Sequence, residues 1–115
     1  MSDTPRLTSI MLVSAMVRRV NSAGGAAVVA ARGDATAGSI LLICLEKGRL
    51  SSYRERLLTA NGSYRWEMVG PSADSDTGAG DSWIARRRQR DPDLWVVELD
   101  IPNAERFAAE AGGDC

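Results

Sequence analysis

The chain has 115 residues, no histidine, and 14 Lys and Arg against 15 Asp and Glu, which leaves a net charge of −1. The length fits one domain (1–115), and the balanced charge argues against a protein that wraps nucleic acid by bulk electrostatics. The absence of histidine excludes His-centred catalytic triads, imidazole acid/base chemistry and His metal ligands.

The N-terminal part predicts one helix after a polar stretch, residues 1–6, that we expect to be frayed. An apolar stripe at helical spacing is formed by Val13, Met16, Val17, Val20 and Ala23. This stripe predicts a helix over about 14–23, in which Ser14 is the N-cap and Gly24-Gly25 is the stop.

The middle of the chain predicts strands joined by turns. Strands are expected at 26–31, 39–46, 49–58 and 64–69, and the wholly apolar second one is typical of a central strand buried on both faces. Lys47-Gly48 is typical of a tight two-residue turn, and Asn61-Gly62 is the clearest hairpin signal, because both of its central residues favour positive φ. The chain therefore indicates a small, mainly antiparallel sheet.

The C-terminal part predicts a mobile loop at 70–80, a helix at 82–90 and a strand at 94–99. Two interpretations of the tail compete. Asn103 caps a helix through Ala111, or Pro102-Asn103 turns a hairpin whose second strand pairs back on the preceding one. In both cases we expect a loosely ordered tail over 108–115. The whole pattern predicts a two-layer α+β fold with helices on one face of the sheet.

Two features bear on compartment and cofactors. The apolar run that ends before Arg18 is too short for a membrane span, and its basic residues follow it, unlike those of a signal peptide. Cys44 lies in an apolar run and is expected to be a buried, inert thiol, and Cys115 is the last residue. We therefore expect a cytoplasmic protein with no membrane contact, no metal and no cofactor.

Arginines form the most prominent charged feature. Residues 1–70 carry nine basic against five acidic side chains, and residues 71–115 carry five against ten. The candidate binding residues are Arg18, Arg19, Arg86, Arg87, Arg88 and Arg90, which we expect to form one surface together with the 70–80 loop. The alternative interpretation is a solvated helix face.

Two shorter motifs are candidate polar sites. Arg32 and Asp34 flank a glycine in a predicted turn, and Asp91 and Asp93 flank a proline before Trp95. A pair of Asp can bind a cation or act as acid and base. The alternative is a turn in which Asp93 accepts backbone N–H groups while Trp95 anchors the strand.

Three stretches, VSAMVRRVNSAGG (13–25), ARGDATAGSILL (31–42) and DPDLWVVE (91–98), together resemble a small bacterial domain-of-unknown-function family, number 1491, of alphaproteobacterial type. The resemblance covers roughly residues 8–100. It implies a cytosolic single-domain protein and no known activity, cofactor or catalytic residue. It also implies a structural role for Arg32 and Asp34, such as an ion pair across the turn. The family usually has an aromatic residue where Leu12 stands, and often ends in a short aromatic-containing strand.

These observations favour a non-enzymatic binding or assembly module whose partner is an acidic protein surface or a structured RNA. The first alternative is a small enzyme that uses Asp91, Asp93 or Glu98 together with an arginine. The second alternative is a homodimer built on an exposed sheet face, with aromatic anchors from Tyr64, Trp66 and Trp95.

Overall fold

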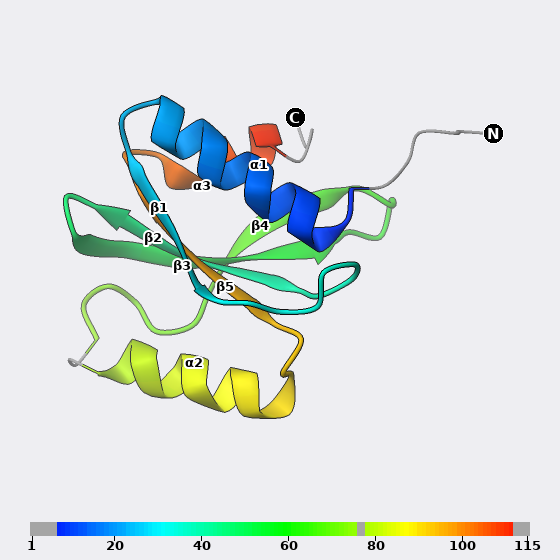
Figure 1. Cartoon of the computed structure of the whole chain (residues 1–115). Helices are drawn as coiled ribbons and strands as arrows, with labels where there is room; N and C mark the ends of the chain where they lie inside the picture. Colours follow the sequence, from blue (N-terminus) through cyan, green and yellow to red (C-terminus); the bar gives the residue numbers. More distant parts are fainter. Residues whose placement is uncertain (1–6, 76–77, 112–115) are drawn as a thin grey trace.

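The computed structural model describes residues 7–75 and 78–111, in which three helices and five strands are formed (Figure 1). In chain order they are α1 (Ser9–Ser22), β1 (Ala26–Ala31), β2 (Ile40–Glu46), β3 (Arg49–Leu58), β4 (Tyr64–Val69), α2 (Ala79–Arg90), β5 (Trp95–Asp100) and α3 (Ala104–Ala111). Each predicted strand is confirmed to within a residue of its expected bounds. The turn at Lys47-Gly48 is also confirmed, with positive φ at both residues, whereas at Asn61-Gly62 only Gly62 has a positive φ, and the loop spans residues 59–63.

The strands form one mixed sheet in the order β1-β5-β2-β3-β4. Strands β2, β3 and β4 are an antiparallel meander, and β5 enters between β1 and β2, antiparallel to the first and parallel to the second. The connection from β1 to β2 is a loop rather than a hairpin, which leaves room for β5 between them. Val96 and Val97 are both buried, as expected for a strand covered on both faces.

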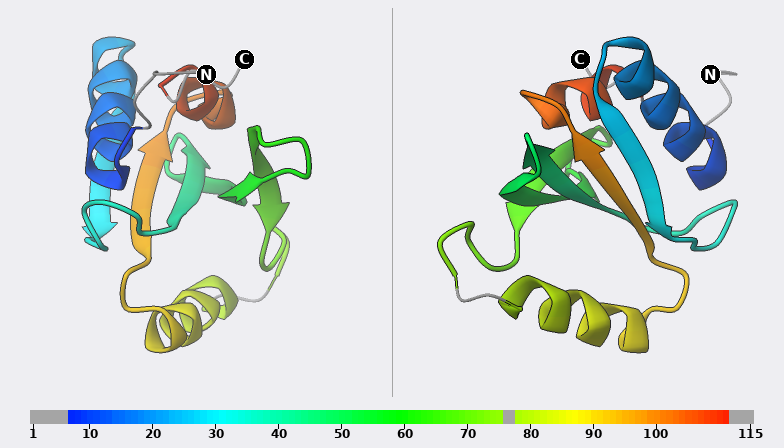
Figure 2. Two further views of the ribbon diagram at one scale, coloured as in Figure 1. Left: turned by 90° about the vertical axis from the view of Figure 1, so that its right-hand side faces the viewer. Right: turned by 60° about the vertical axis from the view of Figure 1, so that its left-hand side comes forward.

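The α+β class is confirmed, but the two-layer arrangement needs correction because helices cover both faces of the sheet (Figures 1 and 2). Helices α1 and α3 lie on one face. Helix α2 lies on the other, where Trp83 and Ile84 pack against Leu41, Leu94 and Val96. The reason is that β2 and β5 are apolar at consecutive positions, so both of their faces need an apolar cover.

Helix α1 begins at Ser9, about one turn before the expected position at 14. Its N-cap is Thr8, whose side chain accepts a hydrogen bond from the Met11 N–H at 3.3 Å, and Ser14 is an exposed helical residue. Leu12 is fully buried, so the buried stripe includes the residue before Val13, where we had begun it. Helix α2 likewise begins three residues early.

The helical interpretation of the tail is confirmed and the hairpin is wrong, because α3 spans Ala104–Ala111. Small side chains make this possible: Ala104 and Ala108 are buried against the main core. The loose tail that we expected from residue 108 therefore does not include 108–111. Three parts of the chain lie outside the described residues: the segment 1–6 that we expected to be frayed, residues 76–77 of the expected mobile loop, and residues 112–115 of the expected loose tail.

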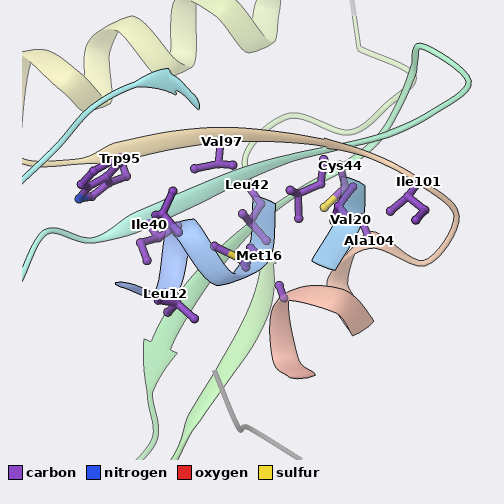
Figure 3. Close-up of a cluster of buried hydrophobic side chains, with 13 residues drawn as sticks. Leu12, Met16, Val20, Ile40, Leu42, Cys44, Trp95, Val97, Ile101 and Ala104 are labelled. Carbon is purple, nitrogen blue, oxygen red and sulfur yellow. The ribbon is translucent and has the colours of Figure 1, made fainter. Parts of the chain in front are cut away.

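The main core lies between the sheet and the α1/α3 layer (Figure 3). Helix α1 contributes Leu12, Met16 and Val20, and these side chains meet Leu42 of β2 and Val97 of β5. None of the helices in the described part of the chain is both long and apolar enough to span a membrane.

Cys44 belongs to this core and has 2% of its surface exposed, as predicted for an inert thiol. Burial raises the pKa of the Cys44 thiol from 9.0 to about 11, with a smaller contribution from the negative charge of Glu105. A thiolate is the reactive form of cysteine, so this environment suppresses its chemistry near neutral pH.

The raised pKa of Cys44 predicts a loss of stability at alkaline pH. Below pH 9 the thiol is protonated in both the folded and the unfolded chain, and the stabilisation is fully present. As the pH rises toward 11 only the unfolded chain ionises, so the free energy of unfolding falls by about 2–3 kcal/mol. Urea titrations across this range in a Cys115→Ser background measure the effect. A Cys44→Ala variant in the same background is expected to lose this part of the pH dependence, and parallel curves for the two variants would contradict the assignment.

Candidate functional site

The loop between β1 and β2 docks on the turn that precedes β5. The Asp34 N–H donates to the Asp93 carbonyl at 3.0 Å, and the Trp95 indole N–H donates to the Asp34 carbonyl at 2.7 Å. A Cβ atom at Gly33 would overlap the Asp93 carbonyl oxygen and lie 2.7 Å from its carbon. This backbone approach requires glycine at position 33.

The same loop closes the N-terminus of α1. The N–H groups of Ser9 and Ile10 donate to the carbonyls of Thr36 and Ala35 at 3.1 and 2.9 Å, and the Ser9 hydroxyl donates to the Gly38 carbonyl at 2.6 Å. Free N–H groups at a helix start need such acceptors. The loop therefore connects α1 to the turn before β5, which is the last strand in the chain and lies between β1 and β2 in the sheet.

The expected ion pair between Arg32 and Asp34 is wrong, although both residues have structural contacts. The Asp34 carboxylate accepts the N–H groups of Thr36 and Ala37 at 3.1 and 2.8 Å, inside its own turn. The Arg32 guanidinium lies over the Trp95 ring, 5.3 Å from its centroid. The short side chain of Asp34 thus bonds to the backbone of its own turn, while the longer side chain of Arg32 reaches the Trp95 ring.

The Asp91-Pro92-Asp93 turn has a structural role. The Asp91 carboxylate accepts the Asp93 N–H at 3.1 Å, and Asp93 contributes its carbonyl to the docked loop. The turn interpretation is thus supported, with Asp91 rather than Asp93 as the carboxylate that accepts a backbone N–H. Within the described residues no three or more His, Cys, Asp or Glu side chains are grouped so that they could hold a metal.

The arginines of α2 divide into two pairs. Arg87 makes two hydrogen bonds of 2.9 Å to the Glu55 carboxylate, which raise the pKa of its guanidinium. Arg88 donates to the carbonyls of Arg32 and Leu94 at 3.1 and 2.7 Å. Arg87 therefore connects α2 to β3, and Arg88 connects α2 to the residues that follow β1 and precede β5.

Arg86 and Arg90, in contrast, are exposed on α2. The sheet separates α2 from α1, which carries Arg18 and Arg19 (Figure 1). Arg19 pairs with Glu110 of α3 at 3.0 Å. The single arginine surface that we expected from the sequence is therefore not formed.

Three of the predicted site residues, Arg18, Arg32 and Trp95, meet elsewhere, in a groove between α1 and β1 with a volume of about 340 Å³. Its apolar lining comes from Ile10, Val13, Val17, Val29 and Trp95, and its charged lining from Arg18 and Arg32. Both arginines are exposed, and neither makes an ion pair within the part of the chain that the structure describes. Among residues 7–75 and 78–111, no acidic side chain lines the groove.

The groove could have been found in part from the sequence. Val17, which we had assigned to the core stripe of α1, is only partly buried and lies at helical spacing with Ile10 and Arg18 on a second face beside that stripe. What this spacing could not show is that the face would lie beside Val29 and Arg32, because that depends on how α1 packs against β1.

Strand β1, which borders the groove, is an open and uncharged edge of the sheet. Val28 and Val29 are 55% and 36% exposed. The Asn21 side chain accepts the Ala27 N–H at 3.2 Å, so that N–H points outward from the sheet. By the alternation of an antiparallel strand, the N–H and carbonyl of Val29 also face outward. The opposite edge, β4, carries the Arg65–Glu67 ion pair and is less available.

The fold and its loop contacts define a small single-domain α+β protein in which Arg32 and Asp34 of the 31–42 stretch contact Trp95 of the 91–98 stretch. Residues 7–109 match the model of DUF1491, a family of proteins of unknown function, so the chain belongs to that family. This confirms the resemblance seen in the sequence.

Solved structures agree with this assignment. A crystal structure of a DUF1491 protein from Caulobacter crescentus is 27% identical, with a TM-score of 0.76 over 88% of this chain and 94% of that one. An NMR structure of a DUF1491 protein from the same organism has a TM-score of 0.74, 27% identity, and coverage of 90% and 94%. A solution structure of a protein from A. tumefaciens is 28% identical, with a TM-score of 0.67 over 86% and 89%. No curated protein matches the chain.

Proposed function

We propose that the protein is a binding module of the cytoplasm that takes up an extended segment of a partner protein along the β1 edge. The observation that carries this proposal is the open edge at Val29 beside the α1 groove. Exposed edge strands are templates for a further strand, and proteins that do not use them usually protect them with charges or proline. Strand β1 has neither, and the irregularity in its pairing with β5, between Val29 and Ala31, comes after the Ala27–Val29 part of the edge.

Val29 can contact both the backbone and the side chains of a bound segment. Its outward N–H and carbonyl can pair with a partner backbone, while its side chain lines the groove. A partner residue opposite Val29 would place its side chain on the same face of the sheet, toward α1. This is how strand addition acquires specificity in other binding modules. The free Cys44 thiol supports a reducing compartment.

The other functions considered from the sequence have weaker support. Asp91 and Asp93 hold a turn, and neither lines the groove at α1. Trp95 has 1% of its surface exposed, so it cannot anchor a dimer through an exposed sheet face as we expected. On α2 only Arg86 and Arg90 remain for an RNA or an acidic surface.

Affinity capture from a lysate of the source organism, with and without nuclease, tests the proposal when three variants are compared. Val29→Pro removes the outward N–H without a loss from the β1–β5 ladder, and Val29→Ala keeps that N–H while it shortens the side chain. Arg86→Gln/Arg90→Gln is the control on α2. We expect a nuclease-resistant partner whose capture falls at least about tenfold with Val29→Pro, much less with Val29→Ala, and not at all with the α2 control.

Equal capture by the parent and Val29→Pro would overturn the proposal, and so would the recovery of no specific partner. Capture that nuclease abolishes, and that depends on Arg86 and Arg90, would overturn it in favour of RNA contact through α2. Thermal unfolding of each variant shows whether it is folded before capture is compared.

A further inference from the structure

We infer that the segment bound along β1 carries a carboxylate, which Arg18 and Arg32 hold beside an apolar side chain in the α1 groove. This inference rests on the proposed function and specifies its ligand as an acidic, extended peptide.

The first argument is the state of the two arginines. Arg32 is held in place, because its guanidinium lies over the Trp95 ring. Arg18 comes from the opposite wall of the groove, on α1. The nearest acidic side chain along the loop, Asp34, is already used by two backbone N–H groups. Within the described residues, two cationic side chains without a carboxylate partner thus line one groove, and a ligand carboxylate complements them.

The second argument is the apolar floor. Ile10, Val13, Val17 and Val29 form a surface that suits one β-branched or aliphatic side chain. In an added strand, side chains on the same face recur every second residue, roughly 7 Å apart. A ligand with an aliphatic residue opposite Val29 would therefore place its acidic residue two positions away, or present its terminal carboxylate there.

The same contacts disfavour two other occupants. A second copy of the chain would bring four arginines together without an acidic residue, because each copy contributes Arg18 and Arg32. A nucleic acid would find phosphate-binding arginines but no base-stacking surface, since the Trp95 ring is buried. An acidic peptide satisfies both the charged and the apolar lining.

Selection of a random phage-displayed peptide library on the full-length chain tests the inference. We expect the selected peptides to share an Asp or Glu two positions from a β-branched residue, or a terminal carboxylate. Synthetic copies should bind about tenfold more weakly to Arg18→Gln and to Arg32→Gln, and binding should weaken with salt. Arg32→Lys, which keeps the charge, should bind better than Arg32→Gln. Arg86→Gln/Arg90→Gln is the matched control and should bind like the parent.

The variants also separate the two proposals. Uncharged peptides that lose binding with Val29→Pro but not with Arg18→Gln or Arg32→Gln would overturn the carboxylate inference and leave strand addition standing. Acidic peptides that bind Val29→Pro as well as the parent would overturn strand addition and leave the arginine groove standing. A library that yields no peptides specific for the groove, or a chain that dimerises in solution in a manner that Val29→Pro abolishes, would overturn the acidic-peptide ligand.

Discussion

Gly33→Ala is expected to lower the free energy of unfolding by at least about 3 kcal/mol, or to prevent folding. The added methyl group would overlap the Asp93 carbonyl oxygen and approach the Asp93 and Leu94 carbonyl carbons to 2.7 and 2.8 Å. These atoms belong to the backbone, so no side-chain rotation relieves the overlap. The loop would have to move away from the turn and give up the hydrogen bonds of Asp34 to Asp93 and of Trp95 to Asp34.

Gly24→Ala is the matched control for Gly33→Ala. Gly24 has a φ of +92°, and a methyl group added there would have nothing within 4 Å, so the substitution adds only conformational strain, roughly 1 kcal/mol. Urea denaturation of both variants measures the difference. Similar losses for the two glycines would show that the loop does not depend on its close approach to Asp93.

The strands could be predicted from the sequence because their signals are local. The Lys47-Gly48 turn and the alternation around it fix the hairpin of β2 and β3 without reference to the rest of the chain. The position of β5 could not be predicted in this way. It depends on pairing with β1 and β2, which are far away in sequence, and no local pattern specifies a parallel pairing between β2 and β5.

The candidate site was predicted in its parts but not in its arrangement. The sequence singled out Arg18 and Arg32 separately, for a binding surface and for a turn. Their meeting in one groove depends on the packing of α1 on β1, which brings two non-adjacent segments together. The arginines of α2 show the reverse. Their spacing indicated one charged face, but Arg87 is hydrogen-bonded to Glu55, a residue 32 positions earlier in the sequence, and so stabilises the fold.

Two of the three stretches that carry the family resemblance meet at the loop on Trp95, and the third lies beside the same indole. The glycines of 31–42 permit the close approach, the 91–98 stretch supplies the turn and the indole, and Val13 and Val17 of the 13–25 stretch line the groove together with Trp95. Arg88 closes the same junction from the other face of the sheet through the carbonyls of Arg32 and Leu94. These residues maintain the fold, and they position Arg32 and Trp95 in the lining of the groove.

Trp95→Phe is therefore expected to cost about 2–3 kcal/mol, whereas Trp66→Phe should change stability by no more than about 1 kcal/mol. Both substitutions remove the same atoms. At position 95 the lost N–H leaves the Asp34 carbonyl without its donor, and the smaller ring leaves a void in the main core. At position 66 the indole N–H is buried without a hydrogen-bond partner in the described part of the chain, so its removal relieves a desolvation cost that offsets the lost packing.

Urea denaturation at neutral pH gives the two free energies, and the difference between them reflects the lost hydrogen bond and core packing at Trp95 together with the desolvation cost that is relieved at Trp66. A loss at Trp66→Phe equal to or greater than that at Trp95→Phe would contradict this account of the junction. The comparison also bears on the groove, because Arg32 lies over the Trp95 ring. If the indole holds Arg32 in place, Trp95→Phe should weaken acidic-peptide binding as well as stability, while Trp66→Phe should leave binding unchanged.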